Sequence, residues 1–87
     1  MKRKIIDGVT YVEDFTGGPS EAVDAGKNWI TPATLAERFR AICKASGLTS
    51  EAIADIAGVT PNTICNYRRG RAPVPRSVWR LVEARKL

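Results

Sequence analysis

Two asparagines and three arginines stand close together in the second half of the chain. Asn62 and Asn66 are four residues apart, which is one turn of a helix, and Arg68, Arg69 and Arg71 follow within five residues of Asn66. Each asparagine amide offers a hydrogen-bond donor and an acceptor, and each guanidinium presents a fork of donors that matches a phosphate. Amides at helical spacing beside guanidiniums are typical of a surface that meets a nucleic acid.

Two short helices joined by a tight turn are predicted to position these side chains. Thr49 and Thr60 each precede an apolar-periodic run as candidate N-caps, and Gly58 lies between the runs, where a turn needs a positive φ. These signals predict helices over residues 50–57 and 60–69.

The second predicted helix has two unlike faces. Ile64 and Tyr67 share one face, which we expect to pack in the core. The opposite face, at i, i+3, i+4 and i+7 spacing, carries Asn62, Cys65, Asn66 and Arg69. One face is therefore expected to pack and the other to read a ligand, although ordinary surface polarity would also explain the two asparagines.

This segment resembles the helix-turn-helix DNA-binding domains of the Cro and lambda-repressor family. The family pattern runs from a leucine and a threonine through a turn glycine to a closing glycine, and it is matched by Leu48, Thr49, Ala54, Ile56, Gly58, Val59, Thr60, Thr63, Ile64 and Gly70. The resemblance covers residues 34–87. It implies a small transcriptional regulator of the kind found in phages and mobile elements.

Carried over residue by residue, the resemblance implies roles for the polar side chains. Pro61, Asn62 and Asn66 would face bases in the major groove, where an asparagine amide donates to N7 of adenine and accepts from its N6 amine. A second set would hold phosphates without reading sequence, and it comprises Ser50, Thr60, Thr63, Arg68, Arg69 and Arg71. Ser50 stands where the family often has a longer glutamine, so backbone N–H groups at that helix start would supply the contact.

The charge of the chain is unevenly distributed. Its 87 residues carry a net charge of +5, with four basic and five acidic side chains in residues 1–33 but ten basic and four acidic in residues 34–87. A basic half suits a phosphate-facing surface, and the alternative is a solvated surface that keeps the protein soluble. A chain this short makes one small domain, which leaves little room for a deep enzyme cleft.

Neither a metal site nor a catalytic site is predicted. The chain has no histidine, and its two cysteines, Cys43 and Cys65, fall in separate predicted helices without metal-binding spacing. We expect no cofactor, no membrane span and no enzymatic activity. Two unpaired thiols fit a cytoplasmic protein, and Cys65 is either a small side chain tolerated near a groove or a redox-sensing thiol.

The N-terminal extension, residues 1–28, is expected to begin with a β-hairpin. Lys4–Ile6 and Val9–Val12 flank Asp7-Gly8, a dipeptide favoured in type I′ turns. An isolated hairpin is marginal in water, so this one must dock on the helices or pair with a second chain. Residues 13–28 are acidic and rich in helix breakers, which predicts a linker with a short helical turn from Ser20, or an acidic strip that screens the DNA surface or engages a partner.

Residues 29–87 are expected to form the helical domain. Thr31 and Pro32 open a first helix that ends near Ser46, before Gly47, and its apolar positions Leu35, Phe39, Ile42 and Cys43 are predicted core. A last helix begins at Pro75 and turns Val78, Leu81 and Val82 inward. Trp79 either seals the core or forms a dimer contact.

The sequence thus predicts a mainly α fold, a lambda-repressor-like domain of four to five helices with an N-terminal β-hairpin. The predicted function is sequence-specific regulation, as a repressor that binds double-stranded DNA as a homodimer on an inverted repeat. The alternative is a protein-interaction module such as an antiactivator or antitoxin. The arginine cluster after Asn66 favours DNA, because a protein-binding module has no need of it.

Overall fold

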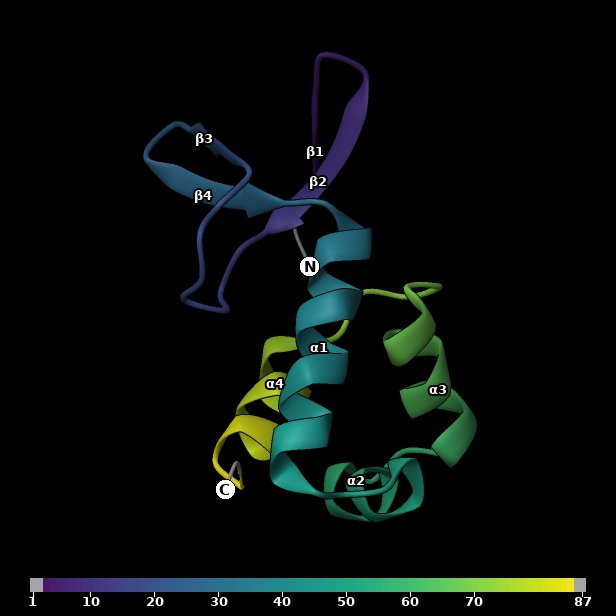
Figure 1. Cartoon of the computed structure of the whole chain (residues 1–87). Helices are drawn as coiled ribbons and strands as arrows, with labels where there is room; N and C mark the ends of the chain where they lie inside the picture. Colours follow the sequence, from purple (N-terminus) through teal and green to yellow (C-terminus); the bar gives the residue numbers. More distant parts are fainter. Residues whose placement is uncertain (1–2, 86–87) are drawn as a thin grey trace.

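The computed structural model describes residues 3–85 as a four-stranded sheet followed by four helices (Figure 1). The strands are β1 (Arg3–Ile6), β2 (Val9–Glu13), β3 (Ala22–Asp24) and β4 (Lys27–Ile30). The helices are α1 (Pro32–Ser46), α2 (Ser50–Ala57), α3 (Pro61–Arg69) and α4 (Arg76–Glu83). The predicted mainly α fold with an N-terminal β-hairpin is confirmed.

The sheet lies beyond the N-terminal end of α1 and consists of two antiparallel hairpins that diverge from each other (Figure 1). The strand order is β1-β2-β4-β3, so β2 and β4 form the centre. The first hairpin is the predicted one. Its turn residues Asp7 and Gly8 have φ angles of 49° and 78°, the positive values that a type I′ turn requires.

The predicted linker over residues 13–28 is wrong, and no helical turn begins at Ser20. The segment instead contains β3, which pairs with β4 through a two-residue turn at Ala25 and Gly26, with φ angles of 51° and 75°. Alanine seldom adopts a positive φ, so Gly26 was the only sequence signal for this turn. β4 also crosses the expected boundary between residues 28 and 29, and the sheet continues almost to the start of α1.

Helix ends follow the predicted capping residues. Three threonine side chains accept hydrogen bonds from backbone N–H groups in the first turns of α1, α2 and α3, and these N-caps are Thr31, Thr49 and Thr60. A left-handed glycine ends each of the same helices. α4 departs from the prediction by one residue, because Pro75 is its N-cap and Arg76 its first helical residue.

The core is centred on Phe39 of α1, which is fully buried. Its ring packs edge-on against Tyr67 of α3, with centroids 6.3 Å apart, and lies 6.4 Å from the ring of Trp79 on α4. Trp79 is only 3% exposed, so its interpretation as a core residue is confirmed. The sheet joins the same core through Val12 and Ile30, which pair across β2 and β4 and are both fully buried.

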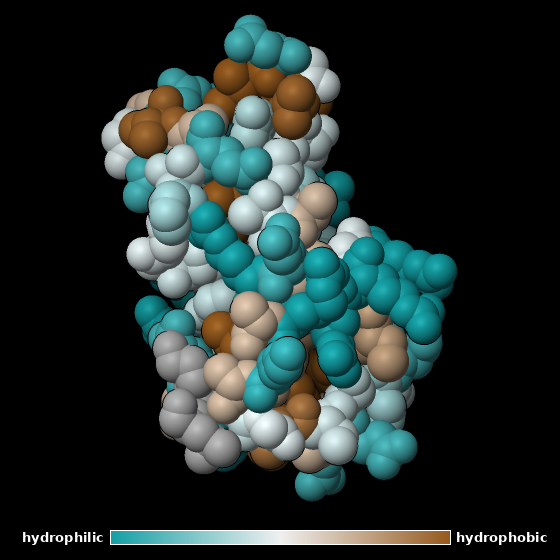
Figure 2. All heavy atoms as spheres, in the orientation of Figure 1, coloured by the Kyte–Doolittle hydropathy of each residue, from teal (hydrophilic) through white to brown (hydrophobic). Residues whose placement is uncertain are grey.

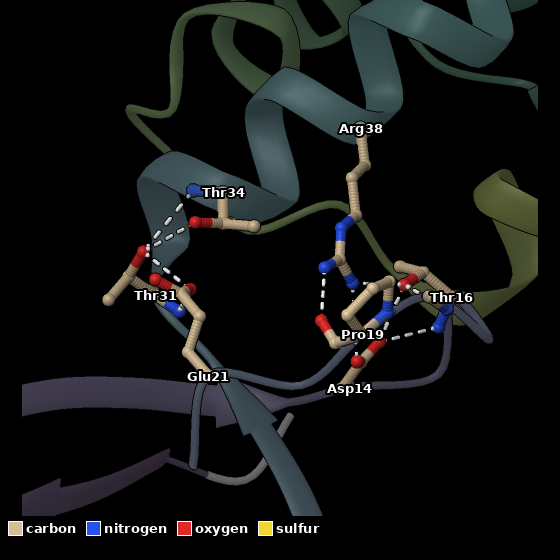
Figure 3. A network of polar contacts seen from close by, with 8 residues as sticks. Asp14, Thr16, Pro19, Glu21, Thr31, Thr34 and Arg38 are labelled. Carbon is tan, nitrogen blue, oxygen red and sulfur yellow. Dashed lines mark hydrogen bonds and ion pairs between the residues drawn. The ribbon is translucent and has the colours of Figure 1, made fainter.

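A partly buried ion pair fastens the extension to α1 (Figure 3). The side chain of Asp14 is 2% exposed and accepts hydrogen bonds from the backbone N–H of Thr16 at 2.8 Å and from Arg38 Nη1 at 3.2 Å. Arg38 also donates to the Thr16 hydroxyl and to the carbonyl of Pro19. Asp14, one of the acidic residues of the expected linker, is thus a structural anchor.

Glu21 makes a second link between the extension and the helices (Figure 3). Its carboxylate accepts from the backbone N–H of Thr31 at 2.8 Å and lies 3.1 Å from the Thr31 hydroxyl. The hydrogen bond from the Thr31 backbone, followed by one from the Thr34 side chain, lowers the pKa of Glu21. The sheet is therefore held against the first turn of α1 as a docked element.

Candidate nucleic-acid interface

α3 presents the two faces predicted for it. Ile64 is fully buried and Tyr67 is half-buried against Phe39. On the other face, Asn62 and Arg69 are exposed and Asn66 is half-buried. The helix lies at one side of the molecule, with α1 to its left and α2 below it in Figure 1. Its polar face is therefore accessible to a large partner.

The first turn of α3 is fixed by two threonines. The Thr60 hydroxyl accepts from the backbone N–H of Thr63 at 3.3 Å, and the two hydroxyl oxygens are 2.9 Å apart. Thr60 thus stabilises the start of the helix, a role that accompanies its predicted phosphate contact. Pro61 and Asn62, next along the chain, are both exposed.

Two predicted phosphate-binding residues contact each other. Arg68 Nη1, near the end of α3, donates a hydrogen bond to Ser50 Oγ, the first residue of α2, at 2.9 Å. The serine is too short to reach far from its helix, but it holds a long cationic side chain beside the α2 N-terminus. Two residues that were predicted to bind phosphate independently are therefore in contact with each other.

Arg40 on α1 is a candidate that the sequence analysis missed. Its Nη1 donates to the carbonyl oxygen of Arg68 at 2.5 Å. Arg40, Cys65, Arg68 and Arg69 line a hollow of about 270 Å³ between α1 and α3. Figure 2 shows hydrophilic side chains gathered over these two helices. Arg40 directly follows buried Phe39, and no local pattern links it to a residue 28 positions away.

Arg71 lies beyond the glycine that ends α3. Gly70 has a φ of 76°, and the Arg71 backbone N–H donates to the carbonyl of Asn66 at 3.0 Å. A Cβ at Gly70 would lie 3.4 Å from Cβ of Ala36, so this turn packs closely on α1. The exposed side chain of Arg71 therefore extends from a fixed backbone.

The arginines of this region form no ion pair with a carboxylate in the part of the chain that the structure describes. Within residues 3–85, the ion pairs join Lys4 to Asp24 and Arg38 to Asp14. The guanidiniums of Arg40, Arg68, Arg69 and Arg71 are thus available to an external anion. No ion pair among residues 3–85 neutralises their positive charges.

Both cysteines are free thiols, in different surroundings. Cys43 is buried in the core, where desolvation raises the pKa of its thiol. Cys65 is half-buried beside the hollow. Across the described part of the chain, no three His, Cys, Asp or Glu side chains gather as metal ligands. None of the helices within residues 3–85 is both long and apolar enough to cross a membrane.

The fold and its cationic surface define a DNA-binding domain built on two helices and a tight turn. A family model described as a helix-turn-helix domain matches residues 34–84, more than half of the chain. The chain therefore belongs to the helix-turn-helix domain family. No curated protein and no solved structure matches it.

Proposed function

We propose that this protein is a sequence-specific transcriptional regulator of the Cro and lambda-repressor type. The observation that carries the proposal is the division of α3 into a buried face and a polar face. The polar face ends in guanidiniums that form no ion pair within residues 3–85. α3 enters the major groove, with Pro61, Asn62 and Asn66 toward the bases. The protein represses by occupying its operator, and its role is binding rather than catalysis.

Contacts with the phosphate backbone of the DNA fix the register of α3 on the duplex. Arg69 and Arg71 are exposed at the end of α3 and just beyond it, where each can pair with a phosphate. Ser50, Thr60 and Thr63 lie at the starts of α2 and α3, where helix N-termini favour anions. The free thiols of Cys43 and Cys65 suit the reducing cytoplasm, which we propose as its location.

The proposed homodimer uses the sheet rather than α4. Trp79, the α4 residue considered for a dimer contact, is buried in the core. The sheet instead exposes Ile5 and Val23, at 71% and 67%. Strand register places both on the face that carries Val12 and Ile30, because Ile5 pairs with Thr10 and Val23 with Asn28. These exposed apolar side chains support self-association through the extension.

Footprinting on the DNA that flanks the protein's own coding region tests the proposed function. A dimer should protect two half-sites related by inversion, with centres one helical turn, about 34 Å, apart or a multiple of it. Small regulators of this type often control their own synthesis, so this DNA is the first to examine. Absence of any protected sequence there and in a pool of random duplexes would favour the antiactivator or antitoxin alternative.

Arg69→Ala and Arg71→Ala should weaken binding to all duplexes alike. Each change removes about one phosphate contact, so the slope of log affinity against log salt should become shallower by about 0.9. Base preference should persist, because phosphate contacts carry no sequence information. Titrations at several salt concentrations measure the slope. A changed base preference with an intact slope would show that these arginines read bases.

A further inference from the structure

The hollow between α1 and α3 gathers three guanidiniums around one space. Arg40 comes from α1, and Arg68 and Arg69 come from the last turn of α3, with Cys65 beside them. Arg69 and Cys65 also belong to the polar face of α3. The hollow therefore borders the surface that enters the groove in the proposed function.

Two of these guanidiniums are anchored before any ligand arrives. Arg40 Nη1 donates to the Arg68 carbonyl at 2.5 Å, and Arg68 Nη1 donates to Ser50 Oγ at 2.9 Å. Each anchor uses one nitrogen, and the guanidinium has further N–H donors for another partner. Arginines already held in place lose less conformational freedom when they bind, which favours a tight contact.

Charge identifies the class of ligand. Like charges near one another repel, and an anion between them relieves the repulsion. Glu37 is one turn from Arg40 on α1, but the ion pairs of residues 3–85 do not include it. A phosphate oxyanion matches paired guanidiniums, because each fork can donate two parallel hydrogen bonds to it.

We propose that Arg40 and Arg68 together hold one phosphodiester of the DNA strand that flanks α3. This inference rests on the proposed function and adds α1 to the DNA contacts. Arg68 then acts from its anchored position on Ser50, and the α2 N-terminus adds its favourable potential to the same phosphate. Arg40 determines how far α1 approaches the backbone.

Salt-dependent binding of Arg40→Gln, Arg68→Gln and the double variant to one duplex tests the assignment. Arg40→Gln and Arg68→Gln should each make the slope of log affinity against log salt shallower, by less than the about 0.9 that one whole phosphate contact contributes, because the other arginine still faces the phosphate. The double variant should lose about 0.9 of the slope in total, because both residues serve one phosphate. The matched control is Arg80→Gln, an exposed arginine of α4, which should leave the slope unchanged.

Arg40→Lys tests whether a changed slope in Arg40→Gln comes from the lost charge or from a folding defect. It keeps the positive charge and should therefore retain most of the slope. Equal slopes for Arg40→Gln and Arg80→Gln, with the wild type still binding the duplex, would overturn this inference but leave the proposed function intact. Failure of the wild type to bind any duplex would overturn the proposed function and this inference with it.

Guanidinium NMR signals distinguish DNA from free phosphate as the source of the anion. The Arg40 and Arg68 signals should shift on addition of duplex and stay in place on addition of inorganic phosphate at the same ionic strength. Shifts with inorganic phosphate and none with duplex would overturn DNA as the occupant.

Discussion

Replacing Arg38 with alanine should lower the free energy of unfolding by about 3 kcal/mol. The change leaves the Asp14 carboxylate without its cation, although the side chain of Asp14 is 2% exposed. It also removes the donors to Thr16 and Pro19, which hold the loop between the hairpins against α1. Urea denaturation followed by circular dichroism measures the loss.

Two further variants make this result specific. Arg80→Ala removes an exposed arginine from α4 and should change stability by about 0.5 kcal/mol or less. Adding Asp14→Asn to Arg38→Ala should recover part of the loss, because the buried carboxylate no longer carries an unpaired charge. A loss for Arg38→Ala no larger than that for Arg80→Ala would show that the ion pair does not fasten the extension.

Local signals made most of the helical fold predictable. A threonine precedes each of α1, α2 and α3, and a glycine follows each of them. Because such capping residues act on the few residues beside them, both ends of each helix could be predicted from the sequence. The same holds for the Asp7-Gly8 turn, whose residue types favour its positive φ angles. Buried Ile64 and half-buried Tyr67 likewise follow from helical spacing.

The second hairpin was missed because its turn uses an unfavourable residue. Ala25 adopts a φ of 51° where the sequence offers only Gly26 as a turn signal. The hairpin is stabilised by contacts outside itself, since Ile30 packs in the core and Glu21 binds Thr31. Such tertiary support overrides local propensity and leaves no local pattern.

The candidate site, like the fold, was predictable from the sequence only in part. The polar face of α3 was predictable from spacing, whereas the roles of Asn62 and Asn66 toward bases remain predictions. Contacts between helices were not predictable: Arg68 meets Ser50 across 18 positions and Arg40 across 28. Only the packing of α1, α2 and α3 brings these side chains together.

Asn66→Ala tests most directly the central claim, that α3 reads base sequence. The amide belongs to the polar face of α3, and the backbone carbonyl that accepts from Arg71 is retained in alanine. Alanine also favours the helix, so the melting temperature should hardly change. If the amide pairs with an adenine, the selected duplex should lose about 1–3 kcal/mol of binding free energy, while a scrambled duplex loses almost none.

The measurement is a titration of wild type, Asn66→Ala and Asn28→Ala against selected and scrambled duplexes at one fixed salt concentration. Asn28 is the matched control, because it is an exposed asparagine on β4 of the sheet. We expect Asn28→Ala to keep the wild-type difference between the two duplexes and Asn66→Ala to lose much of it. An equal loss on both duplexes for Asn66→Ala, or no loss on either, would contradict the assignment of α3 as the element that reads the operator.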